Sequence, residues 1–167
     1  KIASGLYQYT SIDDCTRYRV LRLYNHRTAA NTLDFLDCVI EEMPFPIQRV
    51  QTDRGLEFFA EKVQKKMMEY GIKFRPNKPG SPHLNGKVER SQKTDKTEFY
   101  ATVDITSENL QDQLAEWQHY YNWLRPHSAL KGKTPMERYF ELSEETPFSD
   151  EVQNQYIPSD ERIQNAN

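Results

Sequence analysis

The segment Ile47-Gln48-Arg49-Val50-Gln51-Thr52-Asp53-Arg54-Gly55 joins a short strand-forming run to an acidic turn. Its first six residues are typical of a β-strand, and Asp53-Arg54-Gly55 is a turn signal. A carboxylate that directly follows a strand projects at the carboxyl edge of the sheet, where open α/β sheets place their ligand sites. Taken alone, Asp53 is explained more simply as a turn former, which is a common role of aspartate.

Strands and helices are predicted to alternate around this segment. Strands are expected at residues 6–12, 18–24, 47–52 and 72–75, and helices at 32–43, 59–70, 85–100 and 110–124. The short link between the first two strands indicates an antiparallel hairpin. Three of the helices carry apolar residues at helical spacing, which predicts one buried face for each. These residues are Leu33, Leu36, Ile40 and Met43 in the first, Phe59, Val63, Met67 and Tyr70 in the second, and Leu110, Leu114, Trp117, Tyr121 and Leu124 in the last. Thr134-Pro135-Met136-Glu137 combines a Thr cap, a Pro and a Glu in the order that starts a helix. An opening hairpin followed by alternating elements indicates an α/β fold with a mixed sheet.

The composition limits the class of protein. The chain has 167 residues with a formal net charge of −3, and 37% of the residues are hydrophobic. No apolar run approaches the roughly 18 residues of a membrane span, so a membrane partner is not expected. Cys15 and Cys38 lie far apart and form no CxxC pair, which argues against a disulfide scaffold or a four-ligand zinc site and favours a reducing cytosol.

Charge is distributed unevenly along the chain. Residues 134–167 carry eight acidic and two basic side chains, whereas residues 62–98 carry ten basic and four acidic ones. A basic run of this kind indicates a surface for a polyanion, although by itself it is explained more simply as a solvated helix face. The negative total charge therefore does not exclude nucleic acid as a partner.

A second acidic residue, Glu89, is predicted one turn into the basic helix that follows the proline-rich loop 76–83. By helical spacing, it shares a face with polar and basic residues three or four positions away. Alone, Glu89 is explained more simply by an ion pair with Lys93, its neighbour one turn later.

The sequence strings around Asp53 and Glu89 favour a functional role for both acids over these simpler explanations. They are Gln51-Thr52-Asp53-Arg54-Gly55-Leu56-Glu57-Phe58 and Ser81-Pro82-His83-Leu84-Asn85-Gly86-Lys87-Val88-Glu89-Arg90, with 35 residues between Asp53 and Glu89. The sequence resembles the integrase/transposase catalytic core of the retroviral-integrase superfamily, whose pattern is T-D-x-G-x-x-F and then, after 35 residues, a glutamate in N-G-x-x-E-R. A third string, from Tyr121 to Leu130 with 134–138, resembles the segment that follows the core in bacterial insertion-sequence transposases.

The resemblance implies an RNase H-like mixed sheet flanked by helices, and a triad of two aspartates and one glutamate that binds two Mg²⁺ or Mn²⁺ ions. Asp53 and Glu89 match the second and third acids of that triad. Two metal ions can activate the attacking oxygen and stabilise the leaving oxygen of an in-line displacement at phosphorus. Magnesium prefers oxygen ligands and keeps several waters, so a few carboxylates suffice.

The residues beside Glu89 are expected to contact DNA. They are Asn85, Gln92, Lys93 and Lys96 on its own helical face and Lys87 and Arg90 on the neighbouring faces. With the resemblance, the basic run is better explained as a track for DNA than as a solvated face. Binding through phosphate contacts is expected to weaken as salt rises.

The sequence departs from the family pattern at its beginning. Lys1–Gly5 resembles the turn that leaves the family's first strand, so the first catalytic aspartate is expected just upstream of Lys1. Asp13 and Asp14 match the end of the family's second strand and are interpreted as turn and packing residues. A core without its first strand and first acid is expected to bind metal weakly and to lose much of its activity.

Three functions remain open on the sequence alone. The first is a bacterial, cytoplasmic transposase core that binds double-stranded DNA as a homo-oligomer and cleaves and joins strands, associating with the nucleoid when bound. The second is an inactive DNA-binding remnant, and the third is a hydrolytic nuclease with the same fold. The expected organisation is a core at 1–105, a helical extension at 106–142 and a loose acidic tail at 143–167.

Overall fold

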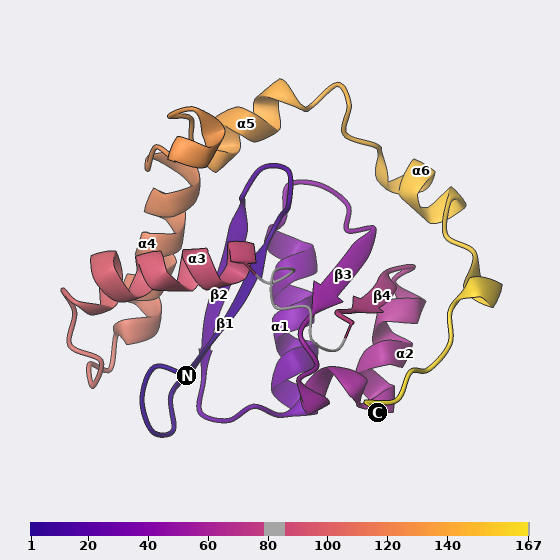
Figure 1. The fold of residues 1–167 in the computed structure, drawn as a ribbon, viewed down its shortest axis with the longest axis horizontal. Coiled ribbons are helices and arrows are strands. Elements are labelled where there is room, and N and C mark those ends of the chain that lie inside the picture. The colour runs from indigo at the N-terminus through magenta and orange to yellow at the C-terminus, as the bar shows by residue number, and fades with distance from the viewer. Residues whose placement is uncertain (79–85, 167) are drawn as a thin grey trace. The chain divides into compact units, whose positions relative to one another are not determined.

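The computed structural model describes residues 1–78 and 86–166, which form two compact units. The hairpin unit consists of Lys1–Asn25 and Gly86–Glu145, and the parallel unit consists of His26–Asn85 and Thr146–Asn167. Figure 1 labels their elements. Within the described residues, the strands form one antiparallel and one parallel pair, which confirms the α/β class. No helix in residues 1–78 and 86–166 has the length and apolarity needed to cross a bilayer.

The hairpin unit begins with β1 (Tyr7–Ile12) and β2 (Arg19–Tyr24), paired antiparallel so that Ile12 lies opposite Arg19. Asp13 forms the turn between them, because its Oδ2 accepts the backbone N–H groups of Cys15 at 3.1 Å and Thr16 at 2.7 Å. The turn role expected of Asp13 is therefore confirmed.

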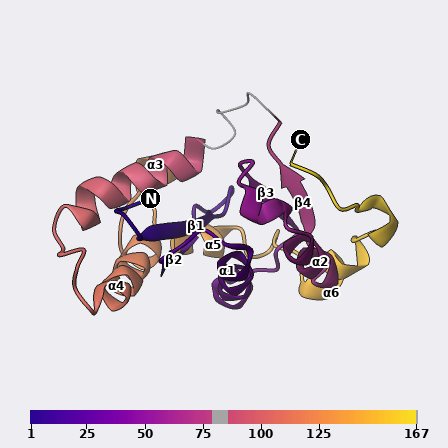
Figure 2. The same cartoon turned by 90° about the horizontal axis from the view of Figure 1, so that it is seen from below.

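Four helical elements complete the hairpin unit. These are α3 (Gly86–Thr94) with its π-helical continuation η3 (Asp95–Tyr100), α4 (Leu110–Trp123), the short η4 (Ser128–Leu130) and α5 (Pro135–Glu141). Helix α3 packs on β1 and α4 packs on β2 (Figure 2). The predicted start of α5 is confirmed, since Thr134 and Glu137 form a reciprocal capping box.

The predicted apolar stripe of α4 is buried except at its last member. Leu110, Leu114, Trp117 and Tyr121 pack in one cluster with Leu21 and Phe99. Leu124 is 63% exposed, so its expected place in the stripe was wrong. The helix ends at Trp123, and the backbone of Leu124 has left the helical conformation that would carry its side chain onto the same face.

Amide side chains of α4 cover the outer edge of β2. The acceptors are the side-chain oxygens of Gln111, Gln118 and Asn122, which bind the backbone N–H groups of Leu23, Leu21 and Arg19 at 2.9, 2.6 and 3.0 Å. A strand edge with unpaired N–H groups is prone to wrong pairing with other chains. Helix α4 thus both buries the apolar face of the hairpin and satisfies its edge.

Gln118→Leu is expected to lower the free energy of unfolding by about 1–3 kcal/mol, because it leaves the N–H of Leu21 unsatisfied beneath the helix. Urea denaturation followed by circular dichroism measures the change. Gln113→Leu is the matched control, since within the described residues the Gln113 amide contacts the exposed Asn109 that caps the same helix. Equal losses in the two variants would contradict a specific edge contact.

The parallel unit contains β3 (Arg49–Thr52) and β4 (Lys73–Pro76), with Val50 opposite Phe74. Its helices are α1 (Ala29–Glu42), the one-turn η1 (Leu56–Phe59) and α2 (Glu61–Glu69). The core cluster consists of Leu36, Val63, Met67, Ile72 and Phe74. The apolar spacing predicted for both helices is therefore confirmed at its central positions.

The C-terminal segment is more ordered than the loose tail expected from its composition. It forms α6 (Ser149–Asn154) and the one-turn η5 (Pro158–Asp160). Further on, Gln164 and Gln64 exchange two hydrogen bonds of 2.8 Å between side chain and backbone. Acidic composition favours disorder, but here polar side chains pair with residues about a hundred positions earlier, which no local sequence pattern reveals.

Candidate functional site

Asp53 directly follows β3 and its side chain is exposed. Its Oδ1 accepts the backbone N–H of Gly55 at 3.1 Å, and its backbone carbonyl accepts the Thr52 hydroxyl at 2.7 Å. The turn-forming role and the projecting carboxylate, which the sequence left as alternatives, therefore occur together. A turn of this kind fixes the carboxylate at the carboxyl end of a parallel strand.

An open groove surrounds Asp53 within the parallel unit. Its lining residues are Arg27, Thr28, Ala29, Asp53, Arg54, Gly55, Leu56, Glu57 and Ala60. A methyl group on Gly55 would lie 3.0 Å from the Glu57 carboxyl group, so a glycine suits the close approach of that side chain. The groove thus joins two carboxylates and two guanidinium groups.

Glu89 lies in the first turn of α3 and is exposed. Within the described residues, its carboxylate makes no hydrogen bond or ion pair, so the pairing with Lys93 that would explain it as a surface residue is not formed. Asp53 belongs to the parallel unit and Glu89 to the hairpin unit. Their convergence on one metal site remains a prediction.

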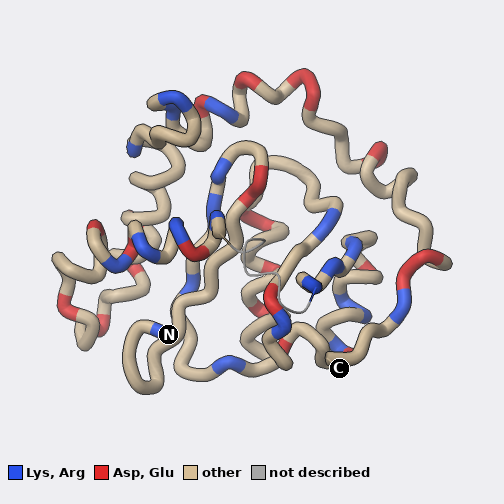
Figure 3. The backbone as a smooth tube through the Cα atoms, viewed as in Figure 1, with Lys and Arg blue, Asp and Glu red and all other residues tan. Residues whose placement is uncertain are grey.

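Apart from Asn85, the residues predicted to contact DNA lie on α3 and η3, a stretch along which Figure 3 marks several basic positions. Arg90, Gln92, Lys93 and Lys96 are all exposed. Lys87 is exposed as well, but its Nζ pairs with the Asp14 carboxylate at 2.7 Å. Asn85 lies outside the described residues.

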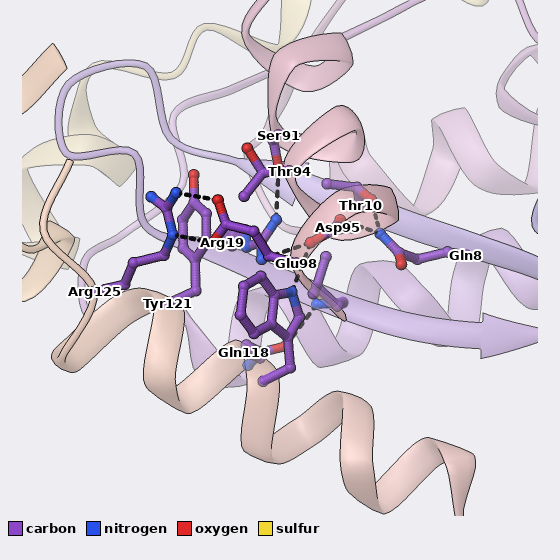
Figure 4. Close-up of polar contacts among 12 residues, drawn as sticks. Gln8, Thr10, Arg19, Ser91, Thr94, Asp95, Glu98, Gln118, Tyr121 and Arg125 are labelled. Atoms are coloured by element: carbon purple, nitrogen blue, oxygen red, sulfur yellow. Dashed lines mark hydrogen bonds and ion pairs between the residues drawn. The ribbon is translucent and has the colours of Figure 1, made fainter. Parts of the chain in front are cut away.

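The opposite side of the same helix carries a buried charged network (Figure 4). Arg19 of β2 and Asp95 of η3 are 0% and 1% exposed, and their Nη2 and Oδ1 atoms lie 2.7 Å apart. Arg19 also donates to Ser91 Oγ at 2.8 Å. Asp95 accepts from Trp117 Nε1 at 2.7 Å and from Gln8 Nε2 at 2.8 Å.

The charge of Arg19 is compensated by its surroundings. Its guanidinium carbon lies 3.3 Å from the centre of the Tyr121 ring, within range of a cation–π interaction. Burial lowers the pKa of Arg19, and the Asp95 carboxylate acts in the opposite direction. Nε of Arg19 has no hydrogen-bond partner within the described part of the chain, so much of the compensation depends on Asp95.

The string after the core extends this network to the C-terminal end of α4. Arg125 donates Nε and Nη2 to both carboxylate oxygens of Glu98 on η3, at 2.7 and 2.5 Å. This bidentate bond lowers the pKa of the Glu98 carboxyl group. His127 is buried with Nε2 at 3.1 Å from the Tyr121 carbonyl, and burial lowers its pKa. The network thus anchors the helix that carries Glu89 to β2 and α4.

The sequence analysis did not identify Arg19 or Asp95. The available signal was the four-residue spacing of Ser91, Asp95 and Phe99, all of which are buried. That spacing marks one face of a helix, but two of its three members are polar, so an apolar pattern does not detect it. Trp117 and Tyr121, interpreted from sequence as core residues, do lie in the core.

The side chains of Asp53 and Glu89 are suited to a hard cation. Exposed carboxylate oxygens are the ligands that Mg²⁺ prefers. Within residues 1–78 and 86–166, no group of three or more His, Cys, Asp or Glu side chains gathers as a metal site. Metal binding by Asp53 and Glu89 therefore remains a prediction from the chemistry of their carboxylate oxygens.

Comparison with known proteins matches the chain to integrases and transposases. Two family models described as integrase core domains match the chain, one over residues 1–82 and the other over residues 70–135. A transposase for insertion sequence element IS904 of Lactococcus lactis is 30% identical over 62% of the chain. A putative integrase of Spiroplasma virus SpV1-C74 is 27% identical over 82% of it. In each case the chain covers 42% of the relative's length.

Solved structures show the same fold. The catalytic core domain of BIV integrase aligns with a TM-score of 0.67 at 20% identity, covering 84% of this chain and 89% of that one. The catalytic core of HTLV-2 integrase, solved in complex with magnesium, aligns with a TM-score of 0.64 at 18% identity, covering 79% of this chain and 90% of that one. The fold is thus RNase H-like. Together with the family models, it shows that the chain belongs to the integrase/transposase superfamily.

Proposed function

We propose that this chain is the catalytic core of an insertion-sequence transposase, which binds DNA and performs metal-dependent strand cleavage and strand transfer. The observation that carries the proposal concerns the exposure and the pairing of two carboxylates, those of Asp53 and Glu89. Asp53 and Glu89 are exposed, and neither is neutralised by an ion pair within the described residues. Two carboxylates without cationic partners repel each other, so bringing them close costs free energy unless a metal ion binds between them.

In this proposal, Asp53 and Glu89 hold divalent cations. When bound, such ions activate the attacking oxygen and stabilise the leaving oxygen of a phosphodiester. The turn at Asp53 orients its carboxylate through the Gly55 N–H. The network around Arg19 and Asp95 holds the helix of Glu89 in place. Residues 1–105 form the core, and residues 106–142 form its helical extension.

DNA is the proposed partner, and the outer side of α3 is the proposed surface. Cationic side chains there meet phosphates, and their contacts release counterions. A homo-oligomer on DNA in the bacterial cytoplasm, associated with the nucleoid, is the proposed setting. One structural relative comes from an intasome of simian T-cell lymphotropic virus. The similarity to insertion-sequence transposases supports the bacterial setting.

Lys96→Gln is expected to weaken binding of a DNA duplex of arbitrary sequence and to reduce the slope of log Kobs against log salt by about 0.9, the effect of one lost phosphate contact. Fluorescence anisotropy at several salt concentrations measures both quantities. Lys131→Gln is the control, since Lys131 is exposed but lies beyond α4 in the hairpin unit. An unchanged slope for Lys96→Gln would remove this residue from the DNA surface.

Strand chemistry is tested with the chain alone and with any residues that its reading frame encodes upstream of Lys1. A labelled donor duplex and a supercoiled target plasmid are incubated with Mg²⁺, with Mn²⁺ or with EDTA. Joined donor–target products that require metal support the proposal. Nicked products without joining would favour a hydrolytic nuclease, and DNA binding without either product would favour an inactive remnant.

A further inference from the structure

The outer edge of β4 holds a carboxylate from the C-terminal segment of the same chain. Lys73 and Asn77 donate their backbone N–H groups to Gln48 and Thr52 on the β3 side, so the peptide groups of Phe74 face the opposite edge. There, Arg75 binds both carboxylate oxygens of Glu161, at 2.8 and 2.7 Å. Arg75 also donates to the Phe74 carbonyl at 2.8 Å, which holds its guanidinium at this edge.

These contacts form an oxyanion site. The Glu161 side chain is only 4% exposed, whereas that of Arg75 is 42% exposed. The Arg75 guanidinium lowers the pKa of Glu161, and the charge of Lys73 contributes in the same direction. A guanidinium fork suits a phosphate group as well as a carboxylate, because both present two oxygens to its parallel donors.

The segment that supplies Glu161 continues toward the Asp53 groove. Gln164 donates its Nε2 to the Phe74 carbonyl at 3.1 Å, which satisfies the edge of β4. The Ala166 carbonyl accepts from Arg54 Nη2 at 2.7 Å, and Arg54 lines the groove beside Asp53. The last described residues thus bind two arginines of the parallel unit, Arg75 and Arg54, and Arg54 lies next to the proposed catalytic Asp53.

We propose that Arg75 and Arg54 form a second contact surface for the DNA backbone, and that residues 161–166 occupy this surface in the absence of DNA. A DNA phosphate replaces the Glu161 carboxylate at Arg75, and the segment is displaced. This inference rests on the proposed function and extends it, because it assigns DNA contacts to Arg75, a member of the basic run, and to Arg54, and names the segment that competes with DNA for them.

Displacement by DNA has a thermodynamic cost. The surface binds DNA only when the segment is undocked. Its apparent association constant is therefore the intrinsic constant multiplied by the fraction of molecules in which the segment is undocked. Weakening the docked state raises that fraction without changing any DNA contact. Glu161→Gln removes the charge on the segment and leaves Arg75 in place, so it is expected to tighten DNA binding about three- to tenfold.

The test compares Glu161→Gln with Asp150→Asn in the same chain. Asp150 is exposed on α6 in the parallel unit, and within the described residues it makes no hydrogen bond or ion pair, so the control removes one negative charge without a contact. The dissociation constant of a fluorescein-labelled duplex is measured at fixed salt. Tightening by Glu161→Gln alone supports the proposal, whereas equal tightening in both variants, or none, overturns it.

A third variant tests the surface itself. Arg75→Gln is expected to weaken DNA binding, and Glu161→Gln added to it should then give no gain. Amide hydrogen exchange at Gln164 gives a readout independent of affinity, because its backbone N–H binds Gln64 in the docked segment and its protection should fall in Glu161→Gln. If DNA binding depends on Lys96 but not on Arg75 or Glu161, this inference fails while the proposed function stands. If the unmodified chain binds no DNA, both fail.

Discussion

Asp53→Asn, in the chain extended upstream of Lys1, is expected to lower the rate of Mg²⁺-dependent strand transfer by about a thousandfold or more, as removal of one member of a catalytic set does. The amide keeps the shape of the side chain and its acceptor oxygen for the Gly55 N–H, so the turn should persist. What is lost is the negative charge that holds a cation. Glu89→Gln is expected to have the same effect.

The matched control is Glu57→Gln, which makes the same chemical change in the same groove. It should alter the rate far less than Asp53→Asn. DNA affinity without metal separates a metal-binding role from a DNA-binding one, because loss of a metal ligand leaves that affinity unchanged or slightly raised. Full activity in Asp53→Asn or Glu89→Gln would show that the site has been assigned to the wrong residues.

Asp95→Asn is expected to produce the largest loss of stability, about 3–5 kcal/mol, because removing one charge of a buried pair leaves the other without compensation. The asparagine still accepts the Trp117 N–H at similar geometry, so the loss reports mainly the unpaired charge of Arg19. Urea denaturation of the chain, followed by tryptophan fluorescence, measures it. Trp117 lies at the centre of the affected cluster.

Glu98→Gln provides the comparison. It makes the same change from carboxylate to amide, three residues later on the same helix. Glu98 forms an ion pair with Arg125, and the Glu98 side chain is 41% exposed. Water screens such a pair, so the expected loss is about 1 kcal/mol or less. If Asp95→Asn cost no more than Glu98→Gln, the buried pair would not hold the helix of Glu89 to the hairpin.

Much of the fold was predictable because its signals are local. The capping box at Thr134, the turn at Asp13 and the apolar stripe of α4 each depend on residues within a few positions of one another. The family also followed from local strings, since the sequence around Asp53 and around Glu89 is distinctive even before its spacing is considered. Short-range steric and hydrogen-bonding preferences suffice for predictions of this kind.

Contacts between distant residues were not predictable in this way. The C-terminal segment was expected to be loose because its composition is acidic, yet Glu161 binds Arg75 across 86 positions. Likewise, the basic run expected to face DNA divides between the two units, and some of its members have acidic partners in the chain, as Lys87 has in Asp14. Net charge over a window does not reveal which charges are already paired.

The sequence by itself determined the order of strands and helices and the family, and it predicted the two acids, because backbone propensity and motif spacing depend on neighbouring residues. Tertiary structure alone decided that Arg19 and Asp95 are buried together and that the edges of β2 and β4 are covered by polar side chains. Burial is a property of the folded chain, in which removal of water makes an unpaired charge or peptide group costly and so selects its partner.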